Sequence, residues 1–249
     1  MMAGIFHYSE QTGILLNDNR VMQGLWIGST LSVMEKLSIK SFIDNGHEYH
    51  LYTYDDLPDV PARTVIKDGN EILPASAIFK YRDRPSYSAF SNFFRYKLLL
   101  ERGGWWVDSD IVCLRPFDFA EDYVFSSEMT PDGEVPNVGA LKVPKGTEAM
   151  AYAWRVCQAK NQHELVWGEV GPRLIGEVVR RYQMEKYVKP YDVFCSIAWG
   201  HLLVPYVIGV PEDAYAIHLW NAQWTFGELD KNASYDPGCI YEQLKARYL

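Results

Sequence analysis

The chain has 249 residues, enough for one α/β enzyme domain with a sizeable core or for two small domains. Hydrophobic residues make up 48% and charged residues 22%, which is the composition of a globular protein. The formal net charge of −8 argues against a nucleic-acid partner, because proteins that bind nucleic acids usually carry a basic surface. An anionic phosphate substrate would have to be attracted by a local cation.

The cysteines and the N-terminus bear on the cellular compartment. Four cysteines lie far apart and include no C-x-x-C pair, which indicates reduced thiols in a cytoplasmic protein. The N-terminal residues MMAGIFHYSEQTG lack the basic region and the apolar run of a secretory signal. No apolar stretch reaches the roughly 18 residues that a spanning helix needs. We therefore expect a cytoplasmic protein that at most contacts a membrane surface.

The first elements in chain order form a strand, a helix and a strand. Residues 24–28 (GLWIG) predict a short buried strand. Ser32 and Glu35 form a capping box, which predicts a helix from there to Asn45. Residues 48–54 alternate between polar and apolar types, as a strand does. This order predicts a parallel sheet with right-handed crossovers.

Loops and short helices are predicted over residues 55–86, which are rich in proline, glycine and charge. A helix over 88–101 is followed by a Gly-Gly stop, a strand over 105–107 and an extended segment over 111–114. Further strands are expected at 123–127 and 139–143, and helices at 147–160 and 172–182. The stretch from residue 216 onward is left unassigned. We predict an α/β fold with one mostly parallel sheet flanked by helices, in a single domain over 1–249.

Asp108 and Asp110 follow the predicted strand 105–107 at the carboxyl edge of the sheet, where open α/β sheets bind ligands. Two carboxylates at this spacing can hold one Mg²⁺ or Mn²⁺, whose remaining positions suit phosphate oxygens. Such an ion neutralises charge on a departing diphosphate. By itself the pair is weak, because one Asp-x-Asp is expected by chance and a solvated turn explains it equally well.

The sequence around the pair is more specific. Residues 90–118 read FSNFFRYKLLLERGGWWVDSDIVCLRPFD. This segment resembles the signature of the DXD sugar-binding glycosyltransferases, which include fungal α-mannosyltransferases, α-1,4-galactosyltransferases, bacterial capsule and lipopolysaccharide enzymes, and glucosylating toxins. In that family a helix of the form S-D-x-x-R precedes a Gly-Gly stop, an aromatic strand, D-x-D and an Arg-Pro.

The resemblance implies a GT-A type fold and a retaining transfer of a sugar. It implies that Asp108 and Asp110 bind the metal and that His218, in AIHLWNAQW, supplies a third ligand, which would favour Mn²⁺ over Mg²⁺. Asn92 and Arg95 share a helix face that would contact the donor. The family usually has Asp where this chain has Asn92, so a negative charge is lost.

Weaker similarities extend over most of the chain, and each has a structural alternative. Trp26 and Trp106 are expected beside the nucleotide, with core packing as the alternative for both. Asn137 is expected to contact the donor, and Glu169, before a Gly-Pro turn, is a possible nucleophile; ordinary loop polarity explains either residue. Either Trp220 or Trp224 is expected to close over the donor.

The donor and acceptor follow from the resemblance only as classes. The donor is expected to be a nucleotide diphosphate sugar, either a UDP-hexose or GDP-mannose, and the acceptor a saccharide or lipid-linked saccharide of bacterial surface polysaccharide synthesis. Residues 1–130 would form the nucleotide-binding half and 131–249 the acceptor half. The basic segment 180–189 (RRYQMEKYVK) can touch anionic lipid or can be a solvated helix face.

Three other functions remain open at this point. A catalytically weak or inactive nucleotide-sugar-binding module would explain Asn92, although it would not need both aspartates. A nucleotidyltransferase would need a glycine-rich phosphate loop, and GLWIGSTLS is poor in glycine. A glycoside hydrolase would need two opposed carboxylates and no metal pair.

Overall fold

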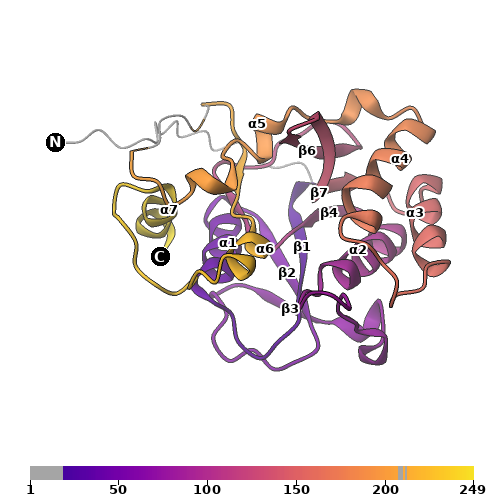
Figure 1. The fold of residues 1–249 in the computed structure, drawn as a ribbon, viewed down its shortest axis with the longest axis horizontal. Helices are drawn as coiled ribbons and strands as arrows, with labels where there is room; N and C mark the ends of the chain where they lie inside the picture. The colour runs from indigo at the N-terminus through magenta and orange to yellow at the C-terminus, as the bar shows by residue number, and fades with distance from the viewer. Residues whose placement is uncertain (1–18, 207–209, 211) are drawn as a thin grey trace.

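The computed structural model describes residues 19–206, 210 and 212–249, and its central feature is a six-stranded sheet (Figure 1). The strand order is β3-β2-β1-β4-β7-β6. The first four strands of that order are parallel, whereas β7 runs antiparallel to both neighbours. The strands are β1 (Val21–Trp26), β2 (Glu48–Thr53), β3 (Val65–Asp68), β4 (Gly104–Val107), β6 (Val124–Thr130) and β7 (Gly133–Val143).

Helix α1 (Val33–Asp44) connects β1 to β2 and is fixed at its start by the predicted capping box. The Ser32 side chain accepts from the Met34 N–H, and Glu35 accepts from the Ser32 N–H at 2.7 Å. Glu35 is fully buried and forms an ion pair with Lys231 at 2.6 Å, so the cap also ties α1 to the C-terminal segment. A charge buried in this way is tolerated because it is paired.

Helix α2 (Ser88–Arg102) leads into β4 and carries one buried face. Phe90, Phe94 and Leu98 recur at helical spacing and are almost fully buried in the core on this side of the sheet. The helix ends at Gly103, whose φ of +69° is a conformation that favours glycine. The Gly-Gly pair therefore sets the direction in which β4 enters the sheet.

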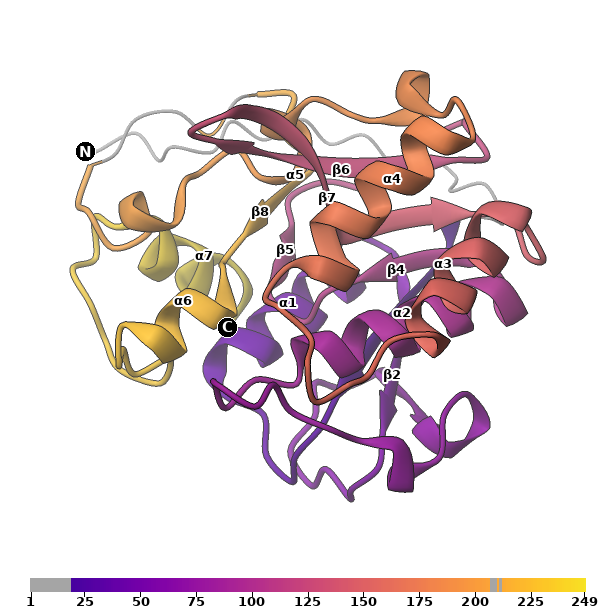
Figure 2. The same cartoon turned by 45° about the vertical axis from the view of Figure 1, so that its right-hand side comes forward.

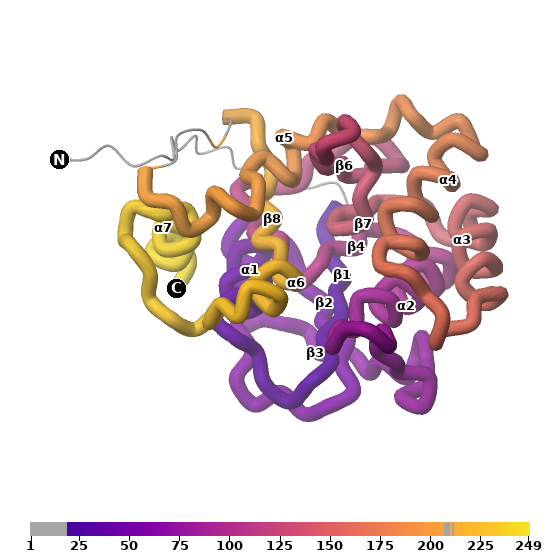
Figure 3. Tube along the Cα trace, in the orientation of Figure 1, coloured from indigo at the N-terminus to yellow at the C-terminus, as the bar shows by residue number. Residues whose placement is uncertain are grey.

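Two layers of helices enclose the sheet. Helices α2, α3 (Glu148–Gln158) and α4 (Leu174–Arg181) lie along one face, as the rotated view shows (Figure 2). Helices α1 and α7 (Ile240–Tyr248) lie on the other side of the molecule (Figure 1). The loops on either side of β3, between β2 and α2, lie in the lower part of Figure 3. No helix among the described residues is long and apolar enough to cross a membrane.

A second, two-stranded sheet joins distant parts of the chain. β5 (Ile111–Cys113) pairs antiparallel with β8 (Ala216–His218). The short helix α6 (Asn221–Phe226) follows β8 directly. The remaining short helices are α5 (Tyr191–Phe194), a π-helix at Glu169–Arg173 and 3-10 turns at Gly69–Glu71, Ala75–Ala77, Glu185–Tyr187 and Trp199–His201.

The predicted α/β sheet with flanking helices is confirmed, with several boundaries corrected. β1 begins at Val21, three residues before the predicted strand, and β7 begins at Gly133, six residues early. The region predicted as loops contains strand β3 at the sheet edge. The four cysteines are buried free thiols, as expected.

Candidate active site

Asp108 and Asp110 lie in the tight turn that joins β4 to β5. The Ile111 N–H donates to the Asp108 carbonyl at 3.0 Å and closes this turn. The Asp108 N–H donates to the Gly139 carbonyl of β7 at 2.7 Å, which fixes the turn at the carboxyl edge of the parallel strands. The two carboxylates are therefore held where open α/β sheets bind ligands.

His218 reaches the same place from the far end of the chain. It is the last residue of β8 and pairs with Ile111 in the small sheet. Its Nε2 lies 3.2 Å from Asp110 Oδ2, and one ligand atom from each of Asp108, Asp110 and His218 lies within 4.8 Å of the others. These three side chains, which we call the Asp-Asp-His group, are close enough to hold one cation.

The chemistry of the Asp-Asp-His group fits a divalent cation. Two carboxylates suit Mg²⁺ or Mn²⁺, and imidazole suits Mn²⁺ better than Mg²⁺. Arg95 and Trp106 both donate to Oδ1 of Asp108, the indole at 2.8 Å, so both donors orient the carboxylate through the same oxygen. On the second carboxylate, Oδ2 of Asp110 accepts the Asn221 N–H at 2.7 Å. Each carboxylate is thus held in place by donors to one of its two oxygens.

The two carboxyl groups have pKa values shifted in opposite directions. Burial raises the pKa of Asp108; the charge of Arg95 opposes this rise and the charge of Asp110 adds to it. Burial also acts to raise the pKa of Asp110, but the charge and hydrogen bond of His218 together lower it. Burial opposes protonation of His218, yet the Asp110 charge raises its pKa well above the usual value. A bound cation would therefore replace the imidazolium proton.

Arg95 connects helix α2 to the Asp-Asp-His group. Its guanidinium donates to Asp108 and to the Asn92 side chain, and its centre lies 4.7 Å from the Trp106 ring centroid. The side chain is only 3% exposed, and its buried Nε has no hydrogen-bond partner in the described part of the chain. Leaving a buried N–H unpaired costs about 1–3 kcal/mol. The ion pair with Asp108 and the contact with Trp106 offset this cost.

Trp220 covers His218 in an unusual backbone conformation. The two rings are stacked with centroids 4.0 Å apart. Trp220 has a φ of +57°, which is uncommon for a bulky residue and is often found at functional sites. Its indole N–H donates to the Ile197 carbonyl at 3.0 Å. This turn separates β8 from α6 and directs the Asn221 N–H at Asp110.

The Asp-Asp-His group opens into a cleft of about 510 Å³. Eight of the residues predicted for the site line this cleft: Trp26, Asn92, Arg95, Trp106, Asp108, Asp110, Asn137 and His218. Trp26 ends β1, and its indole donates to the Thr30 carbonyl at 2.9 Å. Trp106 is only 1% exposed, so it is a core residue that also borders the cleft.

Two predicted residues lie elsewhere. Trp224 is 1% exposed, donates to the Leu219 carbonyl and contacts Tyr241, so it belongs to the core and not to a cover over the donor. Glu169 does not line the cleft; it pairs with Lys160 at 2.6 Å and accepts the Val166 N–H. Both contacts lower the pKa of Glu169. The contacts with Tyr241 and Lys160 hold these two side chains outside the cleft.

Glu128 is a carboxylate of the cleft that the sequence did not single out. It lies on β6, and its side chain is hydrogen-bonded to Asn137. Burial raises the pKa of Glu128, and the nearby charge of His218 and the Asn137 bond act against that rise. Among the described residues, Glu128 is the one carboxylate besides Asp108 and Asp110 that lines the cleft. In the sequence, the available signal was a charged residue directly after the strand predicted over 123–127.

Part of the chain is similar to a known protein family. Residues 32–129 match the family described as glycosyltransferase sugar-binding region containing DXD motif. No curated protein sequence matches the chain significantly.

Solved structures show more distant similarity. The PaToxG glycosyltransferase shares 16% identity at a TM-score of 0.47, over 67% of this chain and 70% of its own. A mutant transferase shares 10% identity at a TM-score of 0.46, over 82% of this chain and 94% of its own. The WbbM bifunctional glycosyltransferase shares 11% identity at a TM-score of 0.46, over 93% of this chain and 50% of its own.

Proposed function

We propose that this chain is a glycosyltransferase that moves a hexose from a nucleotide diphosphate sugar to a saccharide with retention of configuration, because residues 32–129 match a sugar-binding region with a DXD motif. The observation that carries the proposal is the convergence of Asp108, Asp110 and His218 at one edge of the cleft. A cation held there would neutralise charge on the departing diphosphate. The imidazole ligand favours Mn²⁺ as that cation.

The cleft residues divide into two roles. Trp26, Asn92 and Arg95 lie on elements from residues 1–130, and we assign them to the donor. Trp167 and Phe226 also line the cleft, with ring centroids 5.4 Å apart, and come from residues 131–249. Aromatic faces pack well on apolar sugar faces, so we assign these rings to the acceptor.

We assign Glu128 the role first considered for Glu169. In a covalent route, a Glu128 oxygen bonds to the anomeric carbon as the bond to the diphosphate breaks and its electron pair leaves with the diphosphate. The acceptor oxygen then attacks the same carbon and frees Glu128, while the acceptor proton passes to a diphosphate oxygen. In a front-face route, the diphosphate oxygen takes the proton and Glu128 only orients the acceptor.

Azide separates these two routes. Glu128→Ala should transfer sugar at least about 100-fold more slowly than the native enzyme. In the covalent route, azide restores turnover and yields a glycosyl azide of inverted configuration. Full activity of Glu128→Ala would contradict any role at the reacting carbon, and Glu169→Ala serves as the matched carboxylate control.

The donor is identified by thermal unfolding with uridine, guanosine, thymidine or cytidine diphosphate, each with Mn²⁺, Mg²⁺ or a chelator. A ligand that binds only the folded protein raises the melting temperature. We expect a metal-dependent shift with the uridine or the guanosine compound, followed by sugar transfer from the matching donor. Metal-dependent binding without hydrolysis or transfer would instead indicate an inactive binding module.

We place the enzyme in the bacterial cytoplasm, acting on lipid-linked acceptors of surface polysaccharide synthesis, with segment 180–189 against the membrane. Arg180, Arg181 and Lys186 are exposed, although Arg181 lies over the Tyr152 ring and Lys186 over the Tyr187 ring. Lys189 is half-buried and pairs with Glu121. Flotation with anionic liposomes tests the contact. Failure to float, or flotation unchanged by Arg180→Gln with Lys186→Gln, would contradict it.

A further inference from the structure

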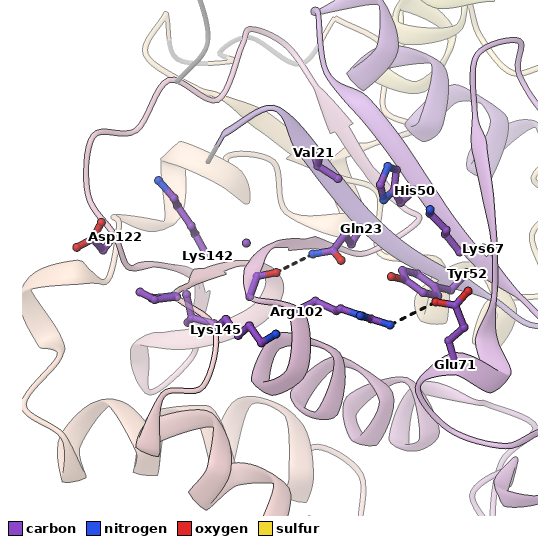
Figure 4. Close-up of a pocket in the computed structure, with 14 residues that line it drawn as sticks. Val21, Gln23, His50, Tyr52, Lys67, Glu71, Arg102, Asp122, Lys142 and Lys145 are labelled. Atoms are coloured by element: carbon purple, nitrogen blue, oxygen red, sulfur yellow. Dashed lines mark hydrogen bonds and ion pairs between the residues drawn. The ribbon is translucent and has the colours of Figure 1, made fainter. Parts of the chain in front are cut away.

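A second cavity, of about 680 Å³, lies at the opposite edge of the sheet. Strand β1 shows the separation, because its first residue, Val21, lines this cavity and its last residue, Trp26, lines the cleft. Figure 4 shows the cavity between the end of α2 and the strands β1 to β3. We call it the basic cavity because of the charges described next.

The basic cavity gathers positive charge in a protein whose net charge is −8. Its charged lining residues are the cations Lys67, Arg102, Lys142 and Lys145 and the carboxylates Glu71 and Asp122. Glu71 pairs with Arg102 at 3.4 Å, but both side chains are half exposed, so this pair contributes little. Lys67 and Lys145 form no ion pair within the described ranges. An incoming anion therefore meets an excess of cations.

The wall of the basic cavity is held in place by backbone contacts. The buried Gln23 side chain donates to the carbonyls of Gly103 and Trp105, at 2.9 and 3.0 Å. A Cβ on Gly103 would lie 2.4 Å from the Lys145 backbone nitrogen, so the chain at Lys145 lies directly against the end of α2. The backbone of this wall is therefore in place before any ligand binds, which limits the entropy lost on binding.

The arrangement of the cations suits an elongated anion. Figure 4 shows the Arg102 side chain between Lys145 on one side and Lys67 on the other, with Tyr52 and Glu71 beside it. The carbonyl end of α2 disfavours negative charge, so attraction has to come from the side chains. A diphosphate carries more oxygens and more negative charge than a single phosphate, so it can bond to more of these donors at once.

We propose that the basic cavity is a second ligand site that binds a diphosphate group, in a soluble compound or in a lipid headgroup. It uses Lys67, Arg102 and Lys145 and is independent of the Asp-Asp-His group. A diphosphate bound in the basic cavity is recognised without a metal, in contrast to the diphosphate of a donor at the Asp-Asp-His group.

Calorimetric titration with inorganic pyrophosphate in chelator tests this site, because the chelator keeps metal-dependent binding at the other site silent. We expect binding that weakens by about tenfold when Lys67 and Lys145 are both replaced by Met, because two of the three cations that contact the diphosphate are then lost. Lys40→Met, which removes an α1 lysine paired with Asp44, is the control and should leave the affinity unchanged.

Asp110→Asn should bind pyrophosphate in chelator as tightly as the native protein. Absence of binding, equal binding by the double variant, or loss of binding in Asp110→Asn would overturn the proposal. Circular dichroism and metal-dependent nucleotide binding verify that the double variant is folded. Vesicles containing a prenyl diphosphate show whether the bound diphosphate belongs to a lipid or to a soluble compound. Cosedimentation that depends on Lys67 and Lys145 assigns a lipid headgroup. Pyrophosphate binding without cosedimentation assigns a soluble compound.

Discussion

His47 makes the stability of the fold depend on pH in a way that can be calculated. Its Nδ1–H donates to the Asn19 carbonyl at 2.9 Å, and its Nε2 accepts the Phe117 N–H at 3.0 Å. The neutral ring satisfies both partners, whereas a second proton on Nε2 would face the Phe117 N–H. Burial lowers the pKa of His47 from 6.5 to about 4, with hydrogen bonds to the backbone of Asn19 and Arg20 acting against this change.

The magnitude follows from proton linkage. The folded-state pKa lies below the unfolded value, so the unfolded chain takes up the proton first as the pH falls. The contribution of His47 to the free energy of unfolding is complete above pH 6.5 and is lost progressively as the pH falls to 4. With these pKa values the loss is about 2 kcal/mol at pH 5 and approaches about 3.4 kcal/mol at lower pH.

Urea unfolding of the native protein and His47→Gln at pH 7.5 and pH 5 measures this effect. Gln can accept the Phe117 N–H but does not titrate, so groups other than His47 cancel in the comparison. We expect the free energy of unfolding to fall by about 2 kcal/mol more in the native protein than in the variant. Equal losses in both proteins would refute the account of His47.

Three further changes test the charges near the Asp-Asp-His group and the packing at the end of α2. Arg95→Met leaves the Asp108 carboxylate without its buried partner, and the free energy of unfolding at pH 7 should fall by about 3 kcal/mol; a loss below about 1 kcal/mol would contradict the buried pair. Asn92→Asp adds negative charge next to Arg95, the partner of Asp108, and so offsets the positive charge near the metal ligands; calorimetry should show Mn²⁺ binding tightened by roughly threefold to tenfold, and weaker binding would be inconsistent with this. Gly103→Ala places a Cβ 2.4 Å from the Lys145 nitrogen at a φ of +69°, so thermal unfolding should show a loss of more than about 2 kcal/mol, and a stable variant would mean that the α2 end can move freely.

Local signals in the sequence predicted several features correctly. Ser32 and Glu35 form the expected capping box, because such a box depends only on residues three apart. The end of α2 and the start of β4 follow from the Gly-Gly pair. The strand before Asp108 could be recognised because it is short and strongly apolar. The turn with Asp108 and Asp110 follows the end of this parallel strand, so it lies at the expected edge of the sheet.

The features that the sequence did not predict depend on distant contacts. Strand β3 has four residues of mixed exposure and is defined only by its pairing with β2. β8 has three residues and exists because β5 pairs with it. The left-handed conformation of Trp220 turns α6 so that Trp224 enters the core, although both tryptophans follow His218 closely. Glu128 lies in no motif and reaches the cleft only through the β6–β7 hairpin.

Binding of Mn²⁺ followed by electron paramagnetic resonance tests the central claim most directly, since the signal of free Mn²⁺ falls as the ion binds. We expect one ion to bind per chain, more tightly when the matching nucleoside diphosphate is present, and we expect Asp110→Asn and His218→Ala each to weaken this binding strongly. Native-like Mn²⁺ binding in both variants would contradict the Asp-Asp-His group as the metal site.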